Sequence, residues 1–252
     1  LPIMLLILSG GLGFYTWNDI FTHRFRFSRY HMQSKIILVM TAVLVVLPAA
    51  YFSLRNSRVE PAQRIFASLF QAITPRTAGF NTASFSAMKD GSIAVLIVLM
   101  LIGGAPGSTA GGLKTTTAAV LVSSAVSVFR RNKETHFFGR RIPEDTIAKA
   151  SALLLLYLAL FLTGGVSISL AEGLPLQDCL FETASAVATV GLTVGITPTL
   201  GLFSKIVLIL LMFFGRVGGL TFLYAAVFPK QENFSSCRWR KSTSDNTKGR
   251  FL

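Results

Sequence analysis

Long apolar runs divide this chain and limit what it can fold into. Each run has the length needed, about 20 helical residues, to cross a hydrocarbon core roughly 30 Å thick. Of the 252 residues, 52% are hydrophobic and only 14% are charged, which is typical of a membrane protein and not of a soluble domain. We therefore expect an all-α, polytopic membrane protein. The runs are Ile36 to Leu54, Ile93 to Ile102 continued as Thr115 to Phe129, Ile147 to Leu170, and Leu202 to Phe228.

Lys and Arg residues give the chain a formal net charge of +13, and most of them fall into three clusters that flank the apolar runs. Clusters of this kind mark the cytoplasmic side of a membrane protein, so the charge needs no nucleic acid partner. We place the segments 21–35, 130–146 and 230–252 in the cytoplasm. A shorter apolar piece, Pro2 to Gly13, is not a signal peptide, because no basic residue precedes it and no small-residue cleavage site follows it.

Two short glycine segments, Thr77 to Thr82 and Thr189 to Thr193, each lie between a short semi-polar run and a long apolar run. Within a bilayer, extended backbone is tolerated only where it is buried or lines a watery cavity. A dehydrated cation suits the carbonyl oxygens of such a segment. The alternative is a glycine that packs one helix on another. We favour an ion filter, whose expected ion-binding residues are Thr77, Ala78, Gly79, Phe80, Asn81, Thr189, Val190, Gly191, Leu192 and Thr193.

Aligning the two filter glycines, Gly79 and Gly191, gives two full units, and each contains a helix, a re-entrant pore loop and a second helix. The units span 36–129 and 147–229. Within each unit, a short segment before the filter is too brief to span a membrane and is expected to form a half-helix. Its C-terminal dipole end would point at the cation. The two half-helices are Pro61 to Ile73 and Leu176 to Ala188.

Residues 1–20 are interpreted as the end of the second helix of a preceding unit. The sequence Gly-Gly-Leu at 10–12 recurs at 111–113 and at 218–220, each time late in an apolar run that leads toward a basic cluster. A pore closed by pseudo-fourfold symmetry needs four units, whereas this chain supplies two and the end of a third. We therefore expect the chain to be a fragment of a longer protein.

The second helix of the first unit is interrupted between Gly103 and Gly112, which a continuous transmembrane helix would not accept without reason. We expect a gate, and the alternative is a simple kink. A phosphate-binding loop is a third interpretation, but Leu113 spoils the required spacing and no strand precedes it. Lys114 should face the cytoplasmic vestibule or a carbonyl cluster. The expected gate residues are Gly103, Gly104, Gly107, Ser108, Thr109, Gly111, Gly112 and Arg216.

Arg216 lies within an apolar run, where an ionised group is costly and usually faces the protein interior or a cavity. It could raise the barrier to cations, or pin the glycine-rich loop through hydrogen bonds to carbonyls. The alternative is a structural pair with Glu182 or Asp178. Arg76, beside the first filter, could tune the outer mouth of the pore or serve only at the surface.

Other reactive side chains give no sign of catalysis, so we expect no enzyme activity and no transition-metal site. Cys179 and Cys237 fall on opposite sides of the membrane in the predicted topology, which excludes a disulfide between them. His23, His31 and His136 lie in basic loops without the spacing of metal ligands, and we expect them to be solvated or at lipid head groups.

Four motifs together resemble the Trk/Ktr/HKT superfamily of potassium transporters, most closely the bacterial Ktr-type, TrkH-like membrane subunit. The resemblance covers Pro2 to Gln231, and the tail beyond it does not look like the short acidic ending of the family. It implies potassium uptake down the electrochemical gradient through the glycine filters, with the interrupting loop as an obstruction beneath them. The motifs are Thr74 to Thr82, Gly103 to Thr115, Gly139 to Pro143, and Ala188 to Thr193 with Gly215 to Gly219.

The same resemblance implies a multi-pass protein of the bacterial plasma membrane, a homodimer, and a peripheral nucleotide-binding regulatory ring on the cytoplasmic face. The transported ion is expected to be K⁺, with no organic cofactor on this chain. Two alternatives stay open. The chain could belong to a sodium-permeable transporter, or it could be a truncated or accessory membrane subunit that does not itself transport.

Overall fold

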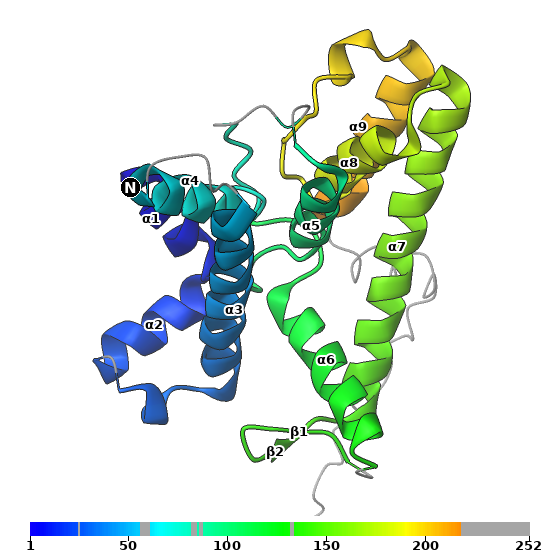
Figure 1. Cartoon of the computed structure of the whole chain (residues 1–252). Coiled ribbons are helices and arrows are strands. Elements are labelled where there is room, and N and C mark those ends of the chain that lie inside the picture. The colour runs from blue at the N-terminus through cyan, green and yellow to red at the C-terminus, as the bar shows by residue number, and fades with distance from the viewer. Residues whose placement is uncertain (25, 56–60, 82–84, 86–87, 132–133, 218–252) are drawn as a thin grey trace, which may run out of the picture.

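The computed structural model describes residues 1–24, 26–55, 61–81, 85, 88–131 and 134–217, and these are mostly helical (Figure 1). The predicted all-α membrane architecture is confirmed, with one small hairpin added. Within the described part of the chain, α3 and α7 are each long and apolar enough to cross a membrane. The α-helices are α1 (Pro2–Gly11), α2 (Phe14–His23), α3 (Met32–Arg55), α4 (Pro61–Ile73), α5 (Asp90–Leu101), α6 (Thr115–Phe129), α7 (Glu144–Glu172), α8 (Leu176–Val187) and α9 (Leu202–Val217).

The first unit follows the predicted order of helix, half-helix and interrupted helix. The half-helix α4 begins at Pro61 and ends at Ile73, as predicted. A proline suits this start because the first helical N–H has no partner within the helix. Along the length of α4, the principal neighbour is α3, so the half-helix returns beside the helix that precedes it. This packing brings the residues after Ile73 into the interior of the molecule.

The second unit repeats that arrangement. Helix α7 ends at Glu172, where Gly173 takes a left-handed conformation that closes the helix. The half-helix α8 then covers all but the last residue of its predicted range. It packs against α5, α7 and α9, and its residues from Phe181 to Val187 are buried (Figure 1). A short helix at the centre of the fold therefore leads directly into the second glycine segment.

The predicted interruption of the second helix is present, since α5 ends at Leu101 and α6 begins at Thr115 (Figure 1). The range 1–20, predicted as the end of one helix, is likewise divided, because α1 and α2 are separated by Leu12 and Gly13. The fourth apolar run forms α9 as far as Val217. Thr82, the third Gly-Gly-Leu sequence, Cys237 and the tail 230–252 lie outside the described residues.

A two-stranded hairpin follows α6 and was not predicted within the segment 130–146. It pairs β1 (His136–Phe137) with β2 (Arg140–Arg141) in antiparallel register. Phe138 and Gly139, between the strands, have φ values of 46° and 77°. Two residues at positive φ form the tight turn that fits the twist of paired strands. His136 therefore lies on a strand and not in an irregular loop.

Candidate functional site: two glycine segments above an interrupting loop

The two glycine segments share an unusual backbone. In the first segment, Thr77 and Gly79 have φ values of 59° and 71°, and in the second, Thr189 and Gly191 have values of 53° and 88°. A β-branched residue at positive φ is a genuine outlier. Such strain persists only where the surrounding structure imposes it, and it clusters at functional sites. Both segments therefore adopt the same costly conformation at matching positions.

Helix α8 supports the second segment from one side. Val190 N donates to the Ser185 carbonyl at 2.8 Å, and Gly191 N donates to Ser185 Oγ at 3.1 Å. Within a trans peptide unit, the N–H and the preceding C=O point in opposite directions. The carbonyl oxygens of Thr189 and Val190 therefore point away from α8. This is the arrangement that a row of carbonyl ligands requires.

The first segment is held by the end of α4. Ala78 N donates to the Thr74 carbonyl at 3.3 Å, which turns the carbonyl of Thr77 the other way. Thr74 Oγ1 donates to the Phe80 carbonyl at 2.8 Å. That hydrogen bond occupies one acceptor position of a carbonyl expected to bind the ion. Phe80 and Asn81 are exposed.

The glycine segments approach each other closely at their glycines. A Cβ atom built on Gly79 would collide with the Val190 carbonyl oxygen and would lie 3.5 Å from Gly191 Cα. No residue other than glycine fits there without a shift of the backbone. The structure thus brings together two segments that are far apart in the sequence, and a carbonyl of one faces the glycine of the other.

The interrupting loop is closed at its base by backbone hydrogen bonds. Gly103 N donates to the Leu113 carbonyl at 2.8 Å, and Thr115 N donates to the Gly104 carbonyl at 3.0 Å. Ile102 and Leu113 also form an isolated parallel bridge. The break in the helix is therefore an ordered loop with joined ends and not a simple kink.

This loop packs against the end of α8, where the second glycine segment begins. A Cβ atom on Gly111 would collide with Thr189 Oγ1, and one on Gly112 would lie 3.3 Å from Ala188 Cα. Thr109, in the same loop, joins the wall of a cavity of about 350 Å³ that Thr77 and Ala78 also line. The loop therefore contacts the second segment and shares a cavity with the first.

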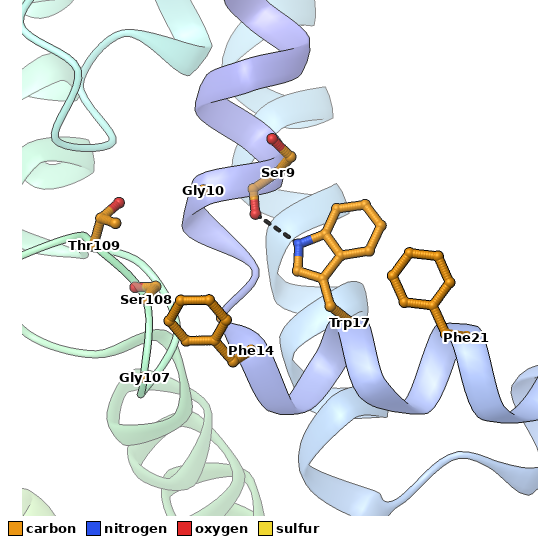
Figure 2. Close-up of a pocket in the computed structure, with 9 residues that line it drawn as sticks. Ser9, Gly10, Phe14, Trp17, Phe21, Gly107, Ser108 and Thr109 are labelled. Carbon is orange, nitrogen blue, oxygen red and sulfur yellow. Dashed lines mark hydrogen bonds between the residues drawn. The ribbon is translucent and has the colours of Figure 1, made fainter.

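The loop is also joined to the break between α1 and α2. Ala105 N donates to the Gly11 carbonyl at 2.9 Å, and Phe14 N donates to the Gly107 carbonyl at 3.4 Å. Figure 2 shows Phe14 beside residues 107–109, with Trp17 farther along α2. These residues line a cavity of about 440 Å³. Trp17 Nε1 donates to the Ser9 carbonyl at 2.9 Å, which ties the two short helices together.

Two cationic side chains bind adjacent carbonyls of the loop. Arg216 Nη1 donates to the Thr109 carbonyl at 2.7 Å, and Lys114 Nζ donates to the Ala110 carbonyl at 2.5 Å. Within the described residues, Arg216 forms no ion pair, and Glu182, one of its two suggested partners, is hydrogen bonded elsewhere. These contacts agree with the interpretations in which Arg216 restrains the loop and Lys114 faces a carbonyl cluster.

The alternative in which Arg76 serves only at the surface is wrong. The residue is only 6% exposed, and its Nη2 donates to Thr41 Oγ1 of α3 at 3.3 Å. Its buried Nε has no hydrogen-bond partner in the structure. Arg76 therefore connects the backbone just before the first glycine segment to the neighbouring long helix.

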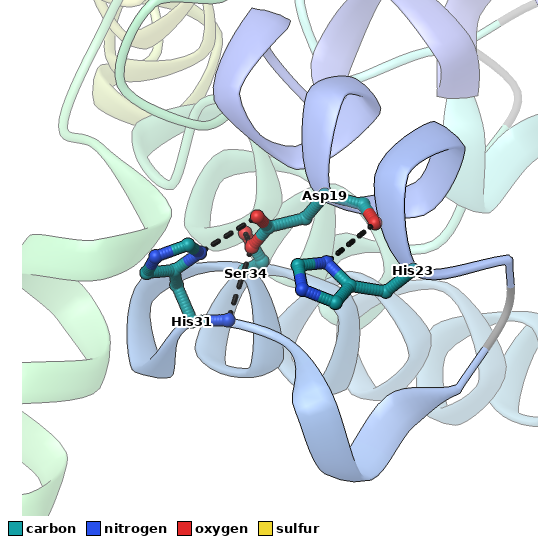
Figure 3. A network of polar contacts seen from close by, with 4 residues as sticks. All are labelled: Asp19, His23, His31 and Ser34. Atoms are coloured by element: carbon teal, nitrogen blue, oxygen red, sulfur yellow. Dashed lines mark hydrogen bonds and ion pairs between the residues drawn. The ribbon is translucent and has the colours of Figure 1, made fainter.

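Sequence reasoning missed a carboxylate cluster between α2 and α3 (Figure 3). Asp19 accepts hydrogen bonds from His31 N at 3.0 Å, His31 Nδ1 at 2.7 Å and Ser34 Oγ at 2.6 Å. His23 Nδ1 lies 3.3 Å from the Asp19 carbonyl. The prediction that His23 and His31 are solvated or at head groups holds in part, since the His31 side chain is 76% exposed but its Nδ1 also contacts Asp19. An aspartate and a histidine 12 residues apart have no periodic signal.

In the part of the chain that the structure describes, no group of three or more His, Cys, Asp or Glu residues could hold a metal ion. Cys179 is a buried free cysteine in α8. Groups suited to a cation at the candidate site are backbone carbonyls, which fit a hard monovalent ion better than a transition metal.

The chain is similar to known cation transporters. The TrkH model, described as cation transport protein, matches residues 5–236. The Ktr system potassium uptake protein B of Bacillus subtilis (strain 168) is 37% identical over 240 residues, covering 92% of this chain and 54% of that protein. The potassium/sodium uptake protein NtpJ of Enterococcus hirae is 36% identical over 230 residues, covering 87% of this chain and 51% of that protein.

A solved structure shows the same fold. The potassium transporter TrkH from Vibrio parahaemolyticus matches with a TM-score of 0.73 at 20% identity, covering 88% of this chain and 50% of that one. The chain spans about half the length of the curated relatives it matches.

Proposed function

Because this chain belongs to the TrkH family of cation transport proteins, we propose that it supplies two pore-forming units of a potassium uptake transporter. The transporter would lie in the bacterial plasma membrane as a multi-pass protein. Its basic segments would face the cytoplasm, and its glycine segments would open to the outside. In this proposal the residues from Thr77 to Asn81 and from Thr189 to Thr193 contribute to the ion filter.

The shared backbone of the glycine segments carries this proposal. Positive φ at Thr77 and Gly79 recurs at Thr189 and Gly191, and the two glycines lie against each other. A structural turn would not need the same strain twice at facing positions. An ion filter needs it, because each glycine segment must present carbonyl oxygens to one ion from a different side.

The loop between α5 and α6 would act as the gate. It meets the second glycine segment at Thr189 and is tied to Arg216 through the Thr109 carbonyl. Opening would require it to leave this position. A peripheral nucleotide-binding ring on the cytoplasmic face, and a second copy of the transporter, are the proposed partners. The nucleotide would bind the ring, since no organic cofactor is proposed for this chain.

Sodium permeation is a second candidate, because one relative is named a potassium/sodium uptake protein. Carbonyl-lined filters suit monovalent cations in general. An accessory subunit that does not transport is the remaining alternative.

Rubidium uptake into potassium-uptake-deficient bacteria tests the proposal. Cells would express either the whole product of the gene that contains this chain or these 252 residues alone, with excess K⁺ or Na⁺ as competitor. We expect the whole product to take up rubidium and K⁺ to suppress that uptake. The 252 residues alone should give none, because two filter segments line only part of a ring.

Suppression by Na⁺ as strong as by K⁺ would favour the sodium-permeable alternative. Absence of uptake by the whole product, with the protein present in the membrane, would contradict transport and favour the accessory role. Uptake by the 252 residues alone would mean that copies of this chain close a pore between them.

A further inference from the structure

Glu182 has a buried carboxylate beside the second glycine segment. The residue lies in the middle of α8 and is 4% exposed. Its Oε1 accepts hydrogen bonds from Thr193 Oγ1 at 2.5 Å and from Val194 N at 3.1 Å. Its Oε2 accepts one from Thr197 Oγ1 at 2.9 Å. All of its partners therefore lie on the stretch that ends the segment and continues beyond it.

Glu182 and Ser185 both accept hydrogen bonds from the second glycine segment and the residues that follow it. They are three residues apart on α8 and so share one face of that helix. Ser185 takes the N–H groups of Val190 and Gly191, and Glu182 takes the N–H group of Val194. Because the N–H of Val194 points at α8, the Thr193 carbonyl points away from it. Helix α8 thus orients carbonyls at both ends of the segment.

Both oxygens of the Glu182 carboxylate accept hydrogen bonds. Two hydroxyl protons and one amide proton converge on its two oxygens, and the Val194 amide can only donate. Burial of a charge is tolerated only where hydrogen bonds replace water, and here they do. Among the described residues, the other buried carboxylate is Asp19, which belongs to the α2–α3 cluster.

The first unit lacks this carboxylate. With Gly79 aligned to Gly191, the position that matches Glu182 is Phe70, an apolar residue. In that unit a cation, Arg76, is buried beside the glycine segment instead. The two segments are therefore alike in backbone but differ in the charge behind them.

We propose that Glu182 is a positioning residue whose negative charge sets the affinity of the second filter segment for its cation. The inference rests on the proposed transport function. The carboxylate holds residues 193–197 in register and places a fixed negative charge behind carbonyls that would face the ion. A negative charge near a cation path lowers the free energy of the bound cation, and in a poorly hydrated site that effect is larger than in water.

The test compares Glu182→Gln with Glu172→Gln in the whole gene product. Glu172 is a matched control, because its Oε1 also accepts hydrogen bonds from a backbone N–H, Gly201 at 2.8 Å, and from a hydroxyl, Ser204 Oγ at 2.6 Å. It joins α7 to α9 away from the glycine segments. Rubidium uptake would be measured over a range of concentrations to separate KM from maximal rate, with membrane abundance measured by immunoblot.

We expect Glu182→Gln to raise the KM for rubidium about ten-fold, the factor that corresponds to about 1.4 kcal/mol, at unchanged abundance. Glu172→Gln should leave KM unchanged. Thr197→Val removes the hydrogen bonds of one hydroxyl, to Glu182 Oε2 and to Thr193 Oγ1, but keeps the charge, so it should raise KM less than Glu182→Gln does. An unchanged KM in Glu182→Gln, or equal shifts in Glu182→Gln and Thr197→Val, would overturn the role of the charge.

If Glu182→Gln fails to reach the membrane, Glu182→Asp decides the question. It keeps the charge on a shorter side chain, so a near-normal KM supports the proposal and a KM raised as far as that of an uncharged variant, Glu182→Ala, overturns it. A wild-type protein without potassium-suppressed uptake would contradict the proposed function itself. Normal wild-type uptake with an unaltered variant KM would contradict only this inference.

Discussion

At the scale of single residues, the glycine segments combine strain with close contact. Thr77 and Thr189 keep left-handed φ values that threonine rarely adopts, and each is followed two residues later by a glycine at positive φ. Their local chemistry could be recognised in the sequence, since a glycine among Thr and Asn residues interrupts an apolar stretch. The positive φ of the threonines could not, because hydrogen bonds from α4 and α8 impose it through tertiary packing.

Gly79→Ala should nearly abolish rubidium uptake. Its new Cβ would collide with the Val190 carbonyl oxygen, and its φ of 71° disfavours any side chain. Backbone strain costs of order 1 to 3 kcal/mol, which corresponds to a factor of about five to more than a hundred in a rate, and the collision adds to it. The measurement is the initial rate of uptake by the whole gene product, normalised to its abundance in the membrane.

Gly139→Ala is the matched control. Gly139 also has a positive φ, 77°, but a Cβ there would have no atom within 4 Å. It should lose some stability and keep its uptake rate. If both alanine variants lose uptake equally, strain alone is responsible and close contact between the glycine segments has no special role.

At the scale of elements, the loop between α5 and α6 is held by several neighbours. Main-chain hydrogen bonds join it to α1 and α2, and one side chain, Arg216, joins it to α9. The interruption itself could be predicted from its glycines and its proline. The hydrogen-bond partners of the loop could not be predicted, because they lie in segments about a hundred residues away on either side, where no periodic pattern links them to the loop.

Arg216→Gln should increase rubidium uptake. The variant loses a charge-assisted hydrogen bond to the Thr109 carbonyl, which is worth about 1.5 to 3 kcal/mol. If that bond holds the loop in the closed position and the open form is rare, the open fraction should rise by about ten-fold or more. Initial uptake rates at low rubidium concentration measure the change.

Lys205→Gln provides the comparison, since Lys205 Nζ donates to the Pro198 carbonyl at 3.3 Å near the other end of α9. It should not alter uptake. Unchanged flux in Arg216→Gln together with reduced membrane abundance would show that the arginine is structural and does not restrain the loop.

Asp19→Asn should destabilise the junction of α2 and α3. The carboxylate receives the backbone N–H of His31, directly before α3, and two side-chain donors (Figure 3). Loss of its charge should cost about 2 kcal/mol and lower the midpoint of thermal unfolding in detergent by about 5 °C. Static light scattering during a temperature ramp would measure it.

Asp145→Asn removes the same charge from an exposed pair with Lys149, whose Nζ lies 2.6 Å from Asp145 Oδ2. Exposed pairs contribute little to stability, so its unfolding midpoint should match that of the wild type. Equal midpoints for the Asp19 and Asp145 variants would mean that the buried cluster does not stabilise the fold.

At the scale of the whole molecule, the helical architecture could be predicted because membrane spans need long apolar runs and half-helices need short ones. The range Pro61–Ile73 was predicted to the residue for this reason. The hairpin at 136–141 is too short to show an alternating pattern, and its turn sequence, Phe138-Gly139, is an uncommon one. Glu182 was considered only as a partner of Arg216, because its true partners lie in a stretch without regular periodicity.

The backbone hydrogen bonds that hold the loop between α5 and α6 limit how its sequence can vary among related proteins. Its ties to Gly11 and Phe14, and those that close its base, use peptide groups, which every residue except proline can provide in full. Residues of the loop other than its glycines could therefore be exchanged without loss of these hydrogen bonds, whereas a Cβ atom on Gly103 or Gly111 would collide with the neighbouring backbone or with Thr189. An inserted or deleted residue, however, would shift every later peptide group out of line with its partner. Between Gly103 and Leu113, natural variants of this chain should consequently keep the glycines and the length of the loop and differ at the remaining positions.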